Sequence, residues 1–193
     1  TETTVERFTY TGVNASSDPP TFTGVTRQVD STNAAEHLSK IQVSESWTQR
    51  DTGRTNAGKY RFERFNFNGT DKIILVDEVN APVVIDSSMN FVDISTSSVA
   101  GSKFVASFKN HMFYAGKSTT PEELVFSIPF DEDDFTSGNG AGSIRVDDTI
   151  TGIKVFRDSL FIFCENRIFK LTGSSSSDFA IQAVTRSIGC ING

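Results

Sequence analysis

FKNHMFYA, residues 108–115, returns in physical outline as FRDSLFIF at residues 156–163. Both stretches place a Phe before a short polar turn, and an apolar, aromatic run follows the turn. An Asp-Phe pair comes later in each copy, at residues 134–135 and 178–179. Self-similarity at a spacing of roughly 40–50 residues indicates stacked supersecondary units, and strand-rich units of that size are typical of propeller blades.

Within each copy we expect two strands on either side of a tight turn, at residues 109–111 and 157–159. Asn110 and Asp158 at the turn centres tolerate the left-handed backbone that short hairpins need. Phe108 and Phe156 precede these turns. We therefore expect them to hold equivalent places in successive sheets, and to be costly to truncate if buried. The strand after each turn is apolar on both faces, as it is when sheets stack on both sides.

A degenerate first copy begins at Tyr60, with strands expected at residues 60–66, 72–77 and 82–86. The sequence thus predicts about three repeats, at residues 60–100, 101–147 and 148–193. Closed propellers usually have 4–8 blades. We therefore expect more chain or more subunits to complete the structure. The start at Thr1 without Met fits a piece of a longer polypeptide.

The N-terminal region, residues 1–59, has a different character. We expect strands at residues 5–11 and 22–29, joined by a polar loop that contains Asp18-Pro19-Pro20. Asn33 followed by Glu36 sets up a capped helix at residues 34–40. Residues 44–59 read as a loop anchored by Trp47. The predicted fold class is therefore all-β, a propeller-like array of antiparallel sheets with one short helix near the N-terminus.

Composition favours a buried aromatic core and argues against tight nucleic-acid binding. The chain has 17 Phe against 3 Tyr and 1 Trp, and Phe has no polar group to place in water. The net charge is −6, whereas a nucleic-acid surface needs clustered Lys and Arg. No apolar run is long enough to span a membrane. Cys164 and Cys190 are expected to be unpaired thiols buried in strands, with a disulfide as the alternative.

The acidic loop Asp131-Glu132-Asp133-Asp134 is the most tempting candidate for a metal site. Against an EF-hand pattern that begins at Asp131, it has Phe135 at the fifth position and Gly142 where the bidentate Glu belongs. We therefore expect a solvated loop whose Phe135 packs inward, and no bound metal.

The remaining candidates carry no catalytic pattern. The glycine-rich stretch 138–142 lacks the Lys-Ser/Thr of a phosphate loop and reads as a flexible connector. His37 and His111 are expected to be exposed, and the Ser174–Ser177 run to be a solvated turn. No pair of carboxylates stands out as a glycosidase pair. We therefore predict no enzyme activity, no catalytic residue and no cofactor.

The strand-rich part resembles a known family. FNFNGTDKIILVDEVNAPVVID, FKNHMFYAG and the run from SIPFDEDDF to SSSSDFAIQAVTRSIGC lie within residues 60–190, about two thirds of the chain. They are similar to the propeller-like repeats of bacteriophage tail structural proteins, especially the tail nozzle (tubular) proteins of short-tailed phages. A complete nozzle subunit is much longer than 193 residues. The resemblance therefore implies either a fragment of one or a neighbouring head–tail or baseplate component that uses the same repeat.

The resemblance implies a non-enzymatic virion protein of the tail. Its partners would be further copies in a homo-oligomeric ring and other tail or head–tail proteins. DNA would pass transiently and non-specifically during genome ejection, without membrane insertion. A carbohydrate-binding propeller that recognises the host is the alternative, although one Trp and three Tyr offer few sugar platforms. A glycan-cleaving propeller is a third possibility.

Overall fold

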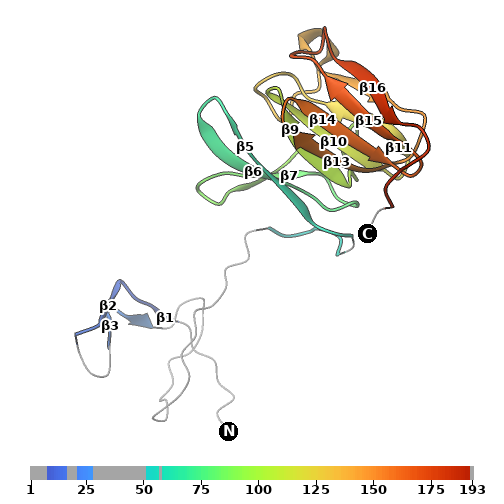
Figure 1. The fold of residues 1–193 in the computed structure, drawn as a ribbon. Helices are drawn as coiled ribbons and strands as arrows, with labels where there is room; N and C mark the ends of the chain where they lie inside the picture. Colours follow the sequence, from blue (N-terminus) through green and yellow to red (C-terminus); the bar gives the residue numbers. More distant parts are fainter. Residues whose placement is uncertain (1–7, 17–20, 28–50, 57, 192–193) are drawn as a thin grey trace. The chain divides into compact units, whose positions relative to one another are not determined.

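The computed structural model describes residues 8–16, 21–27, 51–56 and 58–191. It contains two units, Thr1–Trp47 and Thr48–Gly193, and each is described by itself (Figure 1). The described residues form an all-β protein of several antiparallel sheets. The helix expected at residues 34–40 and the Trp47 anchor lie outside the described residues. In the described ranges the only helical turn is the 3-10 turn η2 (Ser137–Asn139).

The first unit contains a long, interrupted hairpin. Its strands are β1 (Phe8–Thr9), β2 (Gly12–Asn14), β3 (Thr21–Thr23) and β4 (Thr26–Arg27). β1 pairs with β4 and β2 with β3, both antiparallel. The ring of Phe22 contacts Phe8 and Tyr10, with centroids 5.8 and 4.6 Å away. The described parts of the two expected strands are thus extended but interrupted, and β2 lies where a loop was expected.

The second unit contains three sheets of four antiparallel strands. Sheet one has β5 (Arg61–Phe67), β6 (Thr70–Val76), β7 (Val83–Ile85) and β8 (Phe91–Asp93). Sheet two has β9 (Phe104–Phe108), β10 (His111–Lys117), β11 (Thr120–Phe126) and β12 (Gly142–Arg145). Sheet three has β13 (Ile150–Phe156), β14 (Ser159–Cys164), β15 (Ile168–Thr172) and β16 (Ala180–Thr185). In every sheet each strand pairs with the next one along the chain.

The first hairpin turn of every sheet has two residues. Asn68 and Gly69 take positive φ in sheet one, as do Lys109 and Asn110 in sheet two. Left-handed residues match the twist of the flanking strands in such hairpins. In sheet three Arg157 takes the positive φ, at 53°, and Asp158 does not. The expectation for Asn110 is thus confirmed, and that for Asp158 is wrong.

Sheet two is buried on both faces because a sheet packs on each side of it. Met112 and Tyr114 belong to the cluster with sheet one, and Phe113 and Ala115 to the cluster with sheet three. The six residues from His111 to Gly116 are all buried. A strand that is apolar on both faces therefore forms the centre of the unit, as the sequence pattern predicts.

The three sheets approach one another mainly through their first strands. β5 contacts β9, and β9 and β10 contact β13. Figure 1 shows β9 and β13 close together among the strands of sheets two and three. The sheets thus stack in chain order with their first strands at a common centre.

Phe67, Phe108 and Phe156 each end the first strand of their sheet. Phe67 and Phe108 are buried, at 7% and 4% exposure, because a following sheet covers each of them. Phe156 is 61% exposed because no fourth sheet lies against it in the described chain. Phe108 and Phe156 therefore hold equivalent places, as expected. Phe156 is not buried, however, so truncating it should not carry the expected cost in stability.

A buried ion pair fastens residues 51–55 to sheet one. The Arg54 guanidinium donates to Asp77 at 3.1 Å and to the Ala81 carbonyl at 2.8 Å. Asp77 is fully buried and also accepts from the side chain and backbone of Asn80. Burial raises the pKa of Asp77, but these hydrogen bonds outweigh it and the net pKa is lowered. Its contribution to stability is therefore present above about pH 4 and is lost as the pH falls further.

Phe108→Ala should lower the free energy of unfolding by about 3–5 kcal/mol, because it opens a cavity among aromatic rings. Phe156→Ala, at the equivalent but exposed position, should cost less than about 1 kcal/mol in the dilute monomer. Urea unfolding of the two variants measures the difference. Equal losses would contradict the stacking order.

Arg54→Ala should destabilise the protein by about 3 kcal/mol, because it leaves a buried carboxylate without its cation. Arg64→Ala is the matched control, since the Arg64–Asp71 pair has exposed side chains and should contribute about 0–1 kcal/mol. Thermal or urea unfolding at neutral pH compares the two. Similar effects from both substitutions would remove the structural role assigned to Arg54.

Candidate functional site

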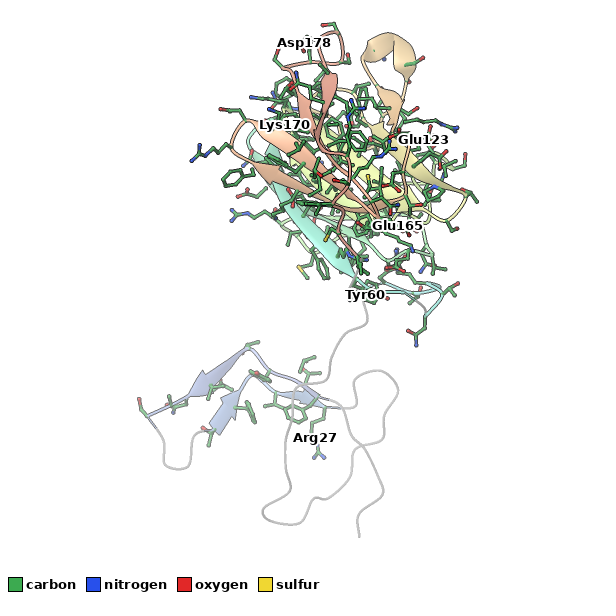
Figure 2. All side chains as sticks on the ribbon, turned by 45° about the vertical axis from the view of Figure 1, so that its right-hand side comes forward. Arg27, Tyr60, Glu123, Glu165, Lys170 and Asp178 are labelled. Atoms are coloured by element: carbon green, nitrogen blue, oxygen red, sulfur yellow. The ribbon has the colours of Figure 1, made fainter. Side chains whose placement is uncertain are left out.

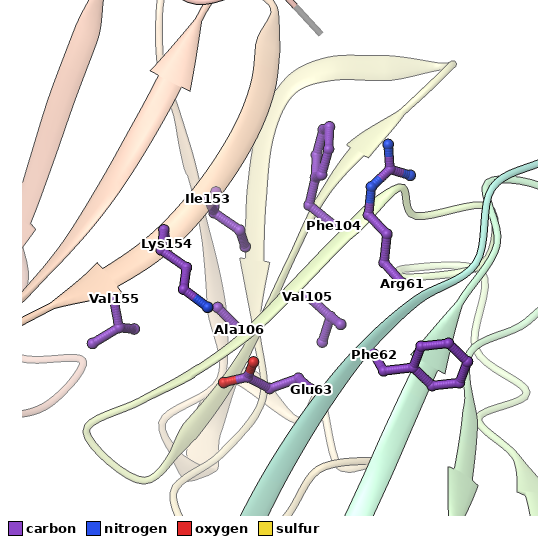
Figure 3. Close-up of a pocket in the computed structure, with 9 residues that line it drawn as sticks. All are labelled: Arg61, Phe62, Glu63, Phe104, Val105, Ala106, Ile153, Lys154 and Val155. Carbon is purple, nitrogen blue, oxygen red and sulfur yellow. The ribbon is translucent and has the colours of Figure 1, made fainter. Parts of the chain in front are cut away.

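A small recess lies where the three first strands meet (Figure 3). It has a volume of about 210 Å³ and is lined by three residues from each of β5, β9 and β13: Arg61, Phe62, Glu63, Phe104, Val105, Ala106, Ile153, Lys154 and Val155. The recess depends on all three sheets, since no sheet alone contributes more than one wall. It brings together residues that lie far apart in the sequence.

Arg61 is held in place on one side of the recess. Its guanidinium donates to Glu78 at 2.8 Å and to the Lys103 carbonyl at 3.3 Å, and it lies 4.8 Å from the centre of the Phe104 ring. These contacts join sheet one to the strand that opens sheet two. The cation is therefore already engaged by the protein and serves packing between the sheets.

Glu63 and Lys154 supply the other two charges. One Glu63 carboxylate oxygen accepts the backbone N–H of Ser107 at 3.1 Å. Lys154 is exposed and extends from β13, and Figure 3 shows its amine and the Glu63 carboxylate directed toward the same space above Ala106. The lining thus mixes both signs of charge with apolar side chains. It contains no His, Cys, Ser or Thr that could act as a nucleophile or proton shuttle.

The acidic loop between β11 and β12 is built for packing. Glu132 is buried and forms an ion pair with Lys72 of sheet one. Phe135 packs inward with its ring 5.7 Å from that of Tyr114, as expected. Phe179 of the second Asp-Phe pair also packs inward, with its ring 5.6 Å from that of Phe113 in sheet two. Each Asp-Phe loop therefore anchors its sheet on the preceding one.

Asp133 has an unusual protonation equilibrium for an exposed residue. A side-chain hydrogen bond with Asp131, partial burial and the charges of Asp131 and Glu132 raise its pKa to about 6. The folded protein thus holds this proton more tightly than the unfolded chain, where the pKa is about 3.9. The carboxyl therefore favours the folded state more at about pH 5 than at pH 7. The raised pKa of Asp133 is thus explained by its acidic neighbours and its partial burial.

Two further expectations are corrected. His111 is buried, with 1% exposure, and its Nδ1 lies 2.6 Å from the Ser127 carbonyl. Its ring packs against Phe126 and Phe179, because sheet three covers this turn. The glycine-rich stretch forms η2 and the start of β12. A side chain at Gly142 would collide with the Phe126 ring, at 2.9 Å. His37 lies outside the described residues.

The two cysteines differ in environment. Both are free, but Cys164 is buried and Cys190 is exposed, so the expectation of two buried thiols is half right. Burial raises the pKa of the Cys164 thiol to about 12, which makes it unreactive at neutral pH. The Ser174–Ser177 turn is mostly exposed and donates to Asp178, which lies at the loop tip in Figure 2. Neither pattern forms a nucleophilic site.

Within the described residues, no group of three or more His, Cys, Asp and Glu side chains is placed to hold a metal ion. None of the helical segments in that part of the chain has the length and apolar character of a membrane span. The sequence matches no protein-family model and no curated protein. The interpretation of this protein therefore depends on its own geometry.

The acidic loop should bind no calcium. Glu132 forms an ion pair with Lys72, so it does not serve as a calcium ligand. This leaves only Asp131, Asp133 and Asp134 as acidic ligands in the loop. The melting temperature should therefore be the same with millimolar calcium and with EDTA, and Asp133→Asn should leave that comparison unchanged. A rise of several degrees with calcium, abolished by Asp133→Asn, would establish a metal site.

Proposed function

We propose that the chain is a non-enzymatic structural component of a bacteriophage tail, part of an oligomeric ring through which the genome passes. The observation that carries the proposal is the stacking of three four-stranded sheets with their first strands at a common centre. In a β-propeller, the blades are four-stranded sheets that surround a central channel, and the observed stacking supports this interpretation. We accordingly propose that these sheets are blades of a propeller.

The charges agree with a protein that DNA slides past. The chain has 24 acidic residues against 18 Lys and Arg. Each phosphate that a protein neutralises adds affinity, so a channel wall works best without basic clusters. At the common centre Arg61 is paired with Glu78, and Glu63 adds a negative charge beside Lys154. The resemblance to tail nozzle repeats supplies the position in the virion.

The energetics of the core favour a structural role. The described polar networks, such as Arg54–Asp77 and Lys72–Glu132, link sheets and loops to one another. The aromatic cluster around Phe179 joins sheet three to sheet two. Such contacts resist sliding of one sheet past another. This suits the wall of a channel through which DNA passes.

Localisation tests the proposal directly. Immunogold electron microscopy of purified phage particles, with antibodies raised against this chain, should label the tail. Mass spectrometry of the same particles should recover its peptides. An antibody against the capsid is the control for particle integrity. The absence of the chain from intact particles would overturn the proposal.

DNA binding provides an independent check. The purified chain should not retard duplex DNA in a gel at physiological salt, because its 24 acidic residues outnumber its 18 Lys and Arg. A basic DNA-binding protein serves as the positive control. Tight, salt-sensitive binding would contradict a role in genome passage.

A further inference from the structure

The outer face of sheet three is an uncovered copy of an interface that the chain already uses. Phe156, Phe161, Phe163 and Ile168 alternate with the buried residues of their strands, so they share this face. The Phe156 and Phe161 rings lie 6.3 Å apart, as Phe108 and Phe113 lie 6.0 Å apart under sheet three. Sheet three therefore presents outward the aromatic pair that sheet two buries.

The outer face of sheet one is the opposite half of such an interface. Phe62 and Ile73, 60% and 40% exposed, lie on its first two strands, on the face that turns away from sheet two. The contacts inside the chain also run through first and second strands. The uncovered apolar residues are thus in the position that the internal interfaces use.

The loops between third and fourth strands strengthen the match. Phe179 lies in this loop of sheet three and packs on sheet two, and Phe135 lies in that of sheet two and packs on the cluster that sheet two forms with sheet one. The corresponding loop of sheet one carries Met89, which is 53% exposed. Met89 therefore lies at the place of an anchor, with its side chain exposed.

Charges repeat in the same way. Lys109, in the first turn of sheet two, lies 3.6 Å from Asp158 in the first turn of sheet three. Arg157 is the equivalent of Lys109 on the uncovered side, beside Lys154 and Lys170 (Lys170 is labelled in Figure 2). The outer face of sheet one carries the Arg64–Asp71 ion pair beside its first turn. Asp71 is thus already paired, and the match between the two faces rests on their apolar residues.

We propose that the outer face of sheet three binds the outer face of sheet one of a second copy of this chain, head to tail. Phe156 and Phe161 receive Phe62 and Met89 of the neighbour. This inference rests on one part of the proposed function, that the three sheets are blades of a larger propeller. Two copies joined at both faces supply six sheets, within the 4–8 of closed propellers. Heterologous contacts of this kind form a ring when the rotation closes.

Two charge substitutions test the pairing on the full 193-residue chain. Phe156→Asp disables the face of sheet three, and Phe62→Asp disables that of sheet one; both residues are exposed, so each variant should fold. Val79→Asp, at a 45% exposed position in the turn between β6 and β7, is the matched control. Circular dichroism checks the fold, and sedimentation equilibrium measures the mass.

The wild-type chain and Val79→Asp should self-associate to a dimer, whereas each interface variant alone should associate more weakly by at least about tenfold. A mixture of Phe156→Asp and Phe62→Asp should form a one-to-one pair, because each supplies the intact face that the other lacks. A wild-type chain that stays monomeric at all concentrations overturns the inference, and so does a variant that still dimerises alone. These results are separate from the localisation of the chain in phage particles.

Discussion

The structure depends on one sheet being apolar on both faces. β10 in sheet two buries Met112 and Tyr114 against sheet one and Phe113 and Ala115 against sheet three. A strand of this kind cannot form the surface of a two-layer protein, because one of its faces would meet water. The flanking sheets are thus required by the same residues that define the repeat. Each flanking sheet also has exposed apolar residues among charged ones on its far side, such as Phe62 in sheet one and Phe156 in sheet three.

Much of this arrangement could be predicted from the repeat. The Phe before each first turn and the Asp-Phe pair in the later loop mark equivalent places, and the structure has them in equivalent places. Periodicity succeeds here because the strands alternate regularly and the turns are short. It also gives the strand boundaries to within a few residues.

What the sequence could not predict are properties that arise between repeats. His111 looks like a turn residue in isolation, and it is buried only because sheet three lies over it. Phe156 looks like a core residue, and it is exposed because it lies on the last sheet. Arg54 and Asp77 are far apart in the sequence and belong to no common motif, so the sequence does not predict their ion pair. The recess between β5, β9 and β13 belongs to no single repeat. Burial and site formation therefore depend on position in the stack, which local sequence does not encode.

The contacts of β5 with β9 also bear on how the protein avoids aggregation. The first strand of each sheet is an edge strand, and its unpaired backbone groups could recruit a foreign strand. In sheet two, Glu63 accepts the outward N–H of Ser107, and Arg61 donates to the Lys103 carbonyl just before β9. These side chains occupy the hydrogen-bonding groups that a foreign strand would need. Sheet one thus hinders the pairing of a foreign strand with the β9 edge of sheet two. Further sheets can then be added only by packing on the apolar faces.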